Sequence, residues 1–524
     1  MCSIGRIAVS IAVCWPICAQ VSVLTANYGT GRTNANLQET NLIVSNVAPG
    51  SFGKLGVFPV DGQVFAQPLY VSGLAIPNQG THNVLFVATQ HNSVYAFDAD
   101  SAASPVLLWQ VNLGPSLPSS MLASDLGAFT DVAPEIGILS TGVIDPGSGV
   151  LYVVAETLQN GKPAFQLHAL DLATGQERMN GPGTIAATVT GTVFDPAQHL
   201  QRPGLLLLNG AVSFAFGSHG DSGLWHGWLM SYDAADVTHQ VGVFLTTANG
   251  QGGSIWQSGR GLTADDAGNL YFVTGNGDYD GARNFGESFV KLSGSPLAVA
   301  DWYTPSNWKM LTDNDYDLSA GPALIPGTHN LIGADKQGNL YLVNGDSMGH
   351  LDAGGAAQVF QPVQTWVYNF ALWPGAASTF VYVQENGGPL RCFQVGPGGF
   401  DPNPVSVSTA PLSGASRGGM TLSANGSQAG TGVFWETTGG YNNPSNPGVL
   451  HAFDASDLSS ELWNSGLNPQ DNLNGFTKFV GPTVVNGKVY AATSNSVVVY
   501  GLLGHGRGLQ PANRRPPLLR SGAR

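Results

Sequence analysis

Cysteine is scarce in this chain, and its placement rules out several kinds of site. Of the four cysteines, Cys2, Cys14 and Cys18 lie within the first 19 residues, and only Cys392 follows them. A lone cysteine cannot form an internal disulfide framework, a zinc site built on paired cysteines or a c-type haem attachment. Any chemistry performed by the body of the chain must use other residue types.

Charge and helical patterning are also sparse. Charged residues make up 10% of the chain, against roughly 25% in ordinary soluble domains. Lys and Arg number 20 and Asp and Glu 34, which gives a formal net charge of −14. That balance argues against a nucleic-acid partner, which requires a basic surface. No long helical pattern follows the N-terminus, whereas glycine, with 70 residues, is plentiful.

The two ends of the chain differ from its middle. Residues 1–19 contain Arg6, a short apolar run and a small residue at Ala19. This pattern is typical of a secretory signal peptide, because the run is too short to span a bilayer. We therefore expect cleavage near Ala19, no transmembrane segment, and a secreted or periplasmic protein. Lipid anchoring at Cys18 stays open as an alternative. The Arg-rich residues 504–524 are expected to form a basic, disordered tail.

A short alternating pattern recurs eight times between the two ends. Its clearest copies are V-Y-A-F-D-A from Val94 and L-H-A-F-D-A from Leu450, and the others begin at Leu167, Leu229, Phe289, Leu340, Leu390 and Val497. Each copy reads as a half-buried strand. The copies lie roughly 50–70 residues apart, a spacing that suits the four strands of a propeller blade. One blade cannot bury its apolar faces alone, so the blades must pack around a central axis.

The fold class predicted from this repeat is all-β: an eight-bladed β-propeller of four-stranded antiparallel blades over residues 20–503. The last repeat supplies only about three strands. We expect residues 52–60 to provide its fourth strand, because this pairing would close the ring and remove its edges. Residues 25–49 read as a polar, loop-like stretch. A monomer is expected.

The repeats resemble those of the pyrroloquinoline quinone (PQQ) dehydrogenases, a family of eight-bladed propellers, over about residues 27–503. The sharpest matches lie in the middle of the chain: G-G-S-I-W ending at Trp256, a strand ending in T-G-N at Asn276, D-N-D-Y-D around Asp315, and D-K-Q-G-N around Lys336. The resemblance implies that Trp256 stacks on PQQ and Lys336 touches it. It also implies that Asp221 and Asn276 bind calcium and that Asp315 is the catalytic base.

These residue types suit that chemistry. An aromatic ring can hold a flat quinone, and calcium prefers carboxylate and amide oxygens. A carboxylate near a substrate hydroxyl can accept its proton. The implied activity is oxidation of an alcohol or a sugar. Glu135 is a looser candidate near the mouth of the channel.

The chain departs from the family pattern at three points. Residues 131–137 lack the two adjacent cysteines of the alcohol-oxidising members, Asp221 stands near the position of a calcium-binding glutamate, and Asn314 replaces a tryptophan. Propellers serve many purposes. The alternative is therefore a non-catalytic scaffold that binds a protein or a cell-envelope polysaccharide.

Overall fold

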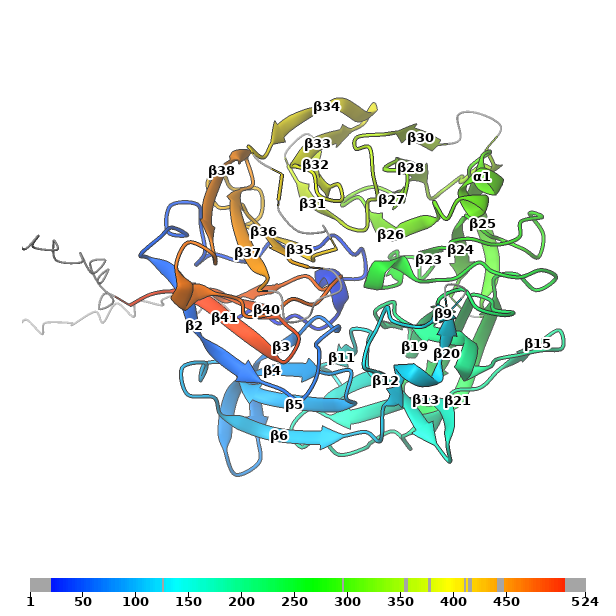
Figure 1. Cartoon of the computed structure of the whole chain (residues 1–524), viewed down its shortest axis with the longest axis horizontal. Coiled ribbons are helices and arrows are strands. Elements are labelled where there is room, and N and C mark those ends of the chain that lie inside the picture. Colours follow the sequence, from blue (N-terminus) through cyan, green and yellow to red (C-terminus); the bar gives the residue numbers. More distant parts are fainter. Residues whose placement is uncertain are drawn as a thin grey trace, which may run out of the picture.

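The protein folds as a ring of eight β-sheets around a central axis, as the sequence predicts (Figure 1). This computed structural model describes residues 20–124, 127–294, 296–352, 357–375, 378–409, 411–412, 417–440 and 447–504. The expected signal peptide, Cys18 and the basic tail from residue 505 lie outside the described residues. No helix among the described residues is long and apolar enough to cross a membrane.

Four consecutive blades form the first half of the ring. Blade 1 contains β3 (Leu69–Ile76), β4 (Gly80–Ala88), β5 (Ser93–Asp98) and β6 (Leu107–Asn112). Blade 2 contains β11 (Val143–Asp145), β12 (Val150–Gln159), β13 (Lys162–Asp171) and β14 (Gly183–Thr184). Blade 3 contains β17 (His199–Gln201), β18 (Leu206–Leu208), β19 (Ala211–Ser218), β20 (Trp228–Asp233) and β21 (Asp236–Leu245). Blade 4 contains β22 (Thr263–Ala264), β23 (Leu270–Val273), β24 (Phe289–Ser293) and β25 (Ala298–Thr304).

The second half completes the circle. Blade 5 contains β26 (Leu318–Leu324), β27 (Asn330–Asp335), β28 (Leu340–Asn344) and β30 (Ala357–Phe360), and α1 (Trp308–Asp313) precedes it. Blade 6 contains β31 (Phe370–Pro374), β32 (Thr379–Gln384), β33 (Leu390–Gly396) and β34 (Gly399–Val407). Blade 7 contains β35 (Met420–Ser423), β36 (Val433–Thr438), β37 (Val449–Asp454) and β38 (Asp457–Asn464). Blade 8 contains β39 (Thr483–Val485), β40 (Lys488–Ala492), β41 (Ser496–Leu502) and β2 (Phe52–Pro59).

The recurring sequence pattern forms the third strand of every blade. The copy from Val94 is β5, and the copy from Leu450 lies in β37. In β5 the side chains of Val94 and Ala96 are fully buried. Such strands are covered on both sides, because each blade packs its faces against its two neighbours.

The ring closes where the sequence predicts. β2 pairs antiparallel with β41, from Phe52 opposite Leu502 to Pro59 opposite Ser496. Phe52 also packs its ring against Trp463 of blade 7, with the centroids 5.0 Å apart. The N-terminal part of the chain therefore supplies the outer strand of the last blade and anchors it to the preceding one.

Part of the polar stretch before β2 lies inside the ring. Residues 23–34, here called the hub segment, lie in the middle of the ring and appear blue near its centre in Figure 1. A hydrogen bond joins this segment to each of the eight blades, in order Val23–Tyr70, Leu24–Ile144, Arg32–Leu205, Thr30–Ala264, Gly31–Leu324, Thr33–Leu372, Asn34–Leu422 and Tyr28–Val484. The sequence predicts a polar, loop-like stretch here but gives no sign of these hydrogen bonds, because they join segments far apart in the chain.

Arg32 is the most strongly bound residue of the hub segment. Its guanidinium is fully buried and donates to the carbonyl oxygens of Leu262, Ala26 and Leu205 and to the hydroxyl of Thr25. Burial lowers the pKa of Arg32 to about 9. Buried carbonyl groups need such donors, since an unpaired one costs free energy.

We predict that Arg32→Met lowers the free energy of unfolding by about 3 kcal/mol or more, because it leaves several buried acceptors unpaired. The urea concentration at the midpoint of unfolding measures the change. Arg178→Met is the matched control: its partially exposed ion pair with Asp171 should contribute no more than about 1 kcal/mol. Equal effects of the two substitutions would refute the special role of Arg32.

Candidate active site

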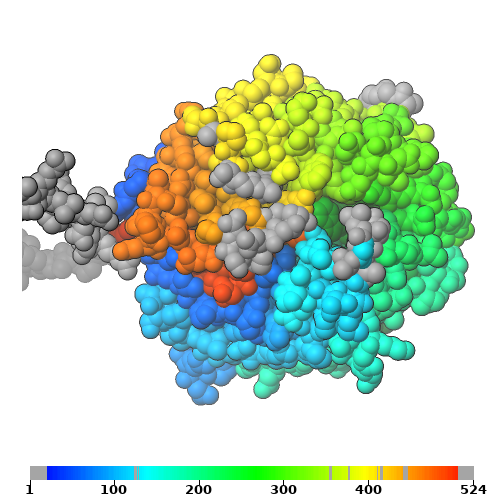
Figure 2. Space-filling view, in the orientation of Figure 1, coloured from blue at the N-terminus to red at the C-terminus, as the bar shows by residue number. Residues whose placement is uncertain are grey.

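The antiparallel topology brings the sequence-predicted residues to one face of the ring. In a four-stranded antiparallel blade, the start of the first strand, the end of the second and the start of the third lie on the same side. Trp256 and Asp315 precede first strands, whereas Asp221, Asn276 and Lys336 follow second strands, in blades 3 to 5. We call this side the site face. Figure 2 looks onto it and shows a hollow near the centre of the ring.

Lys336 is the centre of the candidate site. Its ammonium group lies 2.7 Å from Oδ1 of Asp315 and 2.5 Å from Oδ1 of Asp317. The side-chain amide of Asn276 donates to the same Oδ1 of Asp315 at 2.8 Å. The structure therefore brings three of the predicted residues, Asn276, Asp315 and Lys336, into direct contact.

The two carboxylates around Lys336 differ in their surroundings. The side chain of Asp315 is 66% exposed, whereas that of Asp317 is 12% exposed. Burial raises the pKa of Asp317 to about 6, although Lys336 opposes the shift. Burial alone would lower the pKa of Lys336, but Asp317 and Asp315 together raise it above its ordinary value.

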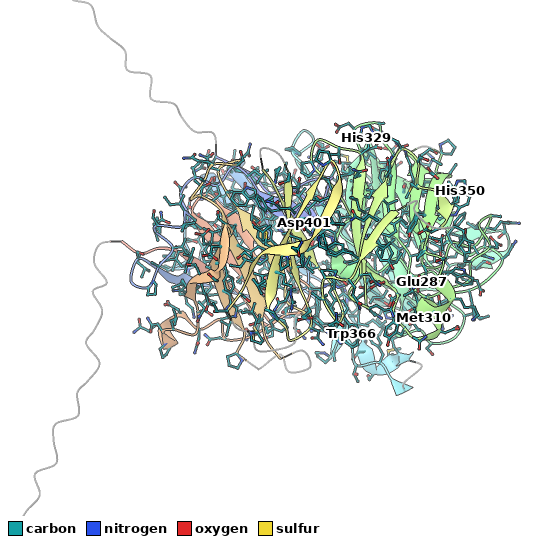
Figure 3. All side chains as sticks on the ribbon, turned by 90° about the horizontal axis from the view of Figure 1, so that it is seen from above. Glu287, Met310, His329, His350, Trp366 and Asp401 are labelled. Atoms are coloured by element: carbon teal, nitrogen blue, oxygen red, sulfur yellow. The ribbon has the colours of Figure 1, made fainter. Side chains whose placement is uncertain are left out.

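Glu287 is a buried acid that the sequence analysis missed. It precedes β24, is fully buried, and accepts hydrogen bonds from the backbone N–H of Leu318 at 3.0 Å and the hydroxyl of Thr312 at 3.3 Å. Burial, and then the nearby charge of Asp317, raise the pKa of Glu287 well above its usual range. No local motif marked it. Figure 3 shows it toward the same side as Met310 and Trp366, opposite His329 and His350.

Asp221 lies at the edge of this group. Its carboxylate forms a hydrogen bond with the hydroxyl of Ser218, and the residue is exposed. Its negative charge contributes to the raised pKa of Asp317. The charge of Asp221 therefore acts on the Lys336 group, although its hydrogen bond is to Ser218.

Trp256 belongs to an aromatic group beside these charges. Its ring meets those of Tyr368 and Phe479 edge to face, with centroids 6.1 and 5.2 Å apart. The Arg417 guanidinium lies over Tyr368 at 5.4 Å and over Trp366 at 5.2 Å. We call Trp256, Trp366, Tyr368, Phe479, Arg417 and Lys478 the aromatic–cation cluster.

Lys478 and Phe479 connect this cluster to residues 131–137. The ammonium group of Lys478 pairs with the carboxylate of Asp131. Burial lowers the pKa of Lys478 to about 8, and Asp131 opposes that shift. Phe479 adopts a φ of 62°, which is rare for a bulky residue and is often found at functional sites.

Glu135, the looser candidate, has partners outside the Lys336 group. Its carboxylate accepts from Nδ1 of His91 at 2.9 Å and from the hydroxyl of Ser116. The residue lies in β10 (Glu135–Ile136), which pairs with β7 (Leu117–Pro118). Glu135 therefore lies in a short two-stranded sheet in the connection between blades 1 and 2.

Any metal ion in the candidate site would have to be bound by oxygen atoms. The described residues contain no group of three or more His, Cys, Asp or Glu side chains arranged to hold a metal ion. However, Oδ1 of Asn276 is buried and has no hydrogen-bond partner in the described part of the chain. A buried amide oxygen of this kind is a suitable ligand for a hard cation.

Comparisons with known proteins identify the fold. No protein-family model matches the chain, and no curated protein matches it. Among solved structures, the C-terminal WD40 domain of Sif2 is 8% identical and covers 86% of this chain and 99% of its own, with a TM-score of 0.50. BamB from Moraxella catarrhalis is 13% identical (87% and 99% covered, TM-score 0.47). A europium-containing methanol dehydrogenase is 14% identical (90% and 81% covered, TM-score 0.45). At these identities the similarity concerns the propeller fold alone.

The buried acids predict a pH dependence of stability. The folded-state pKa values of Asp317 and Glu287 are raised, so their contribution is fully present below the unfolded pKa and is lost as the pH rises through the folded pKa. For Asp317 this window runs from about 4 to about 6. We expect the free energy of unfolding to fall over this range and, through Glu287, beyond it, by up to about 1.4 kcal/mol per pH unit and group.

Glu287→Gln tests this expectation, because the amide can still accept from Leu318 and donate to Thr312. Urea unfolding at a series of pH values should show a shallower decline in the variant and little loss of stability at neutral pH. Asp266→Asn, at an exposed acid, is the control. A wild-type stability that rises with pH, or a Glu287→Gln profile parallel to that of the wild type, would contradict the prediction.

Proposed function

We propose that this protein is a secreted or periplasmic, PQQ- and calcium-dependent dehydrogenase that oxidises an alcohol or a sugar. One observation carries the proposal: the carboxylate of Asp315 is anchored on one side only. Both Asn276 and Lys336 donate to its Oδ1, and no described residue hydrogen-bonds to its Oδ2. The aromatic–cation cluster lies on the same face.

The aromatic–cation cluster suits a flat, polyanionic cofactor. PQQ carries three carboxylates on a fused ring, and aromatic faces and buried cations complement those two features. Trp256 supplies the ring, while Arg417 and Lys478 supply the charge, of which Lys478 is also paired with Asp131. Lys478 is 6% exposed, so a carboxylate beside it would be weakly screened.

Asn276 and Asp221 could supply two of the oxygen ligands of a calcium ion. Oδ1 of Asn276 lacks a partner, and Asp221 offers a carboxylate on the same face. Calcium takes six to eight oxygen ligands, so the cofactor and water would have to supply the remainder. When bound, PQQ would supply the oxidant and calcium would polarise its carbonyl group.

Asp315 is the residue we assign to proton transfer. Its free Oδ2 could accept the proton of a substrate hydroxyl, while Asn276 and Lys336 hold the carboxylate in one orientation. The ammonium group of Lys336 lies between the carboxylates of Asp315 and Asp317. No adjacent cysteines occur at residues 131–137, where Asp131 instead pairs with Lys478, so the proposal assigns no role to a disulfide.

The first experiment is a titration of the purified protein with PQQ, with and without calcium, followed by tryptophan fluorescence. We expect saturable quenching that requires calcium and that Asn276→Ala abolishes, because that variant loses the unpartnered oxygen. Asn403→Ala, at an exposed residue bonded only to its neighbour Asp401, is the matched control. Absence of quenching would overturn the proposal and favour the alternative, a non-catalytic propeller that binds a protein or polysaccharide partner.

A second prediction concerns the proton acceptor. Asp315→Asn should lower kcat by about a hundredfold or more, the usual contribution of a positioned general base, and should leave quenching by PQQ close to that of the wild type. Oxidation of a panel of alcohols and sugars with a dye as electron acceptor measures the rate. An Asp315→Asn variant with near-normal kcat would remove Asp315 from this role.

A further inference from the structure

A polar pocket opens on the site face between blades 5 and 6. Its volume is about 370 Å³, and the side chains that matter most in its lining are Tyr316, Lys336, Gln337, Gln361, Gln364 and Trp366. This volume lies near the lower end of the range for small-molecule sites. Lys336 lines this pocket and also contacts Asp315. The pocket therefore adjoins the proposed proton acceptor.

The lining combines an aromatic ring with several primary amides. Each glutamine amide offers two donor hydrogens and an acceptor oxygen. Most ligand pockets are lined mainly by apolar groups. Here the large rings are those of Trp366 and Tyr316, and most of the other lining side chains are polar. A small alcohol would leave the amides without partners, and a site built for hydrogen bonds discriminates strongly against ligands that cannot form them. A ring bearing several hydroxyl groups can satisfy both the amides and the aromatic face.

Several of these polar groups are available to a ligand. The Gln364 side chain, the Tyr316 hydroxyl and the Trp366 indole N–H form no hydrogen bonds with other described residues. Gln361 donates to the backbone oxygen of Gln337 at 2.7 Å, which leaves its amide oxygen as an acceptor. The arrangement therefore presents both donors and acceptors in one concave surface.

The charge balance favours a neutral ligand. Lys336 is the one charged side chain in the lining, and both Asp315 and Asp317 neutralise it. Nearby, Glu385 is paired with Arg391 at 2.9 Å and accepts from the backbone N–H of Gln364 at 3.0 Å. A phosphorylated or carboxylated ligand would therefore meet only this neutralised cation in the lining, since Arg417, which lies over the Trp366 ring, is not among the lining residues.

We propose that this pocket binds a neutral saccharide, with one sugar hydroxyl directed toward Asp315. Trp366 would pack against the C–H face of the sugar ring, and the glutamine amides would pair with its hydroxyls. As an assignment of substrate, this inference rests on the proposed dehydrogenase function and narrows it from alcohols in general to sugars. As a binding site, the pocket does not require PQQ.

Direct binding tests the inference without the cofactor. The full-length mature protein is titrated with glucose, maltose and cellobiose, and with ethanol and glucose 6-phosphate for comparison, by calorimetry and by saturation-transfer NMR. We expect at least one neutral saccharide to bind saturably and more tightly than ethanol or the phosphorylated sugar. Trp366→Ala should weaken that binding about tenfold, and Gln364→Ala about threefold or more.

Matched substitutions outside the pocket identify non-specific effects. Trp308→Ala on α1 and Gln110→Ala on β6 should leave the affinity unchanged, and Trp366→Phe, which keeps a ring, should retain most of it if the fold is intact. The absence of saturable binding by all three saccharides, or equal losses in pocket and control variants, would overturn the inference.

The failures of the two proposals are distinguishable. Saccharide binding without PQQ-dependent quenching would retain the pocket and refute the dehydrogenase. Quenching without saccharide binding would refute the sugar pocket and leave the proposed dehydrogenase with a smaller alcohol as substrate.

Discussion

The hub segment is the constraint on which the rest of the structure depends. Residues 23–34 provide at least one hydrogen bond to each of eight blades that are far apart in sequence. The buried guanidinium of Arg32 and that of Arg260 are both enclosed there, and Arg260 donates to the backbone oxygen of Arg32. Two like charges are costly to bury together unless every donor finds an acceptor. The centre of the ring is therefore specific in its hydrogen bonds and cannot be replaced by a generic apolar filling.

The hub segment and β2 fix the ring in complementary ways. β2 joins the last blade to the N-terminal part of the chain at the circumference, whereas the hub segment joins all blades near the axis. Near the middle of the ring, a cavity beside Asn27, Arg260 and Phe479 has a volume of only about 10 Å³. The site face is tied to this centre, because the loop that carries Trp256 also contacts the hub segment: the backbone N–H of Gly261 donates to the side-chain oxygen of Asn27.

The sequence predicts the repeating architecture well, because each blade must bury the same alternating strand. It also places Asn276, Asp315 and Lys336 correctly on one face, since strand ends of one type converge in antiparallel blades. Prediction from the sequence fails for residues whose contacts lie on distant segments of the chain. Glu287 has no neighbouring motif, and its burial depends on Thr312 and Leu318 of the next blade. The contacts of the hub segment are missed for the same reason, because its polar groups find partners only after all eight blades assemble.

The position of Lys336 links the chemistry of the site to its choice of ligand. A lysine buried between two aspartates cannot serve as a free cation, so its effect is to orient the carboxylate of Asp315. The same side chain forms part of the wall of the amide-lined pocket. A ligand in that pocket therefore meets the Asp315 group without meeting an unpaired positive charge. Under the proposed function, a neutral polyol would suit this arrangement, because its hydroxyls could pair with the amides while one of them is directed toward the carboxylate.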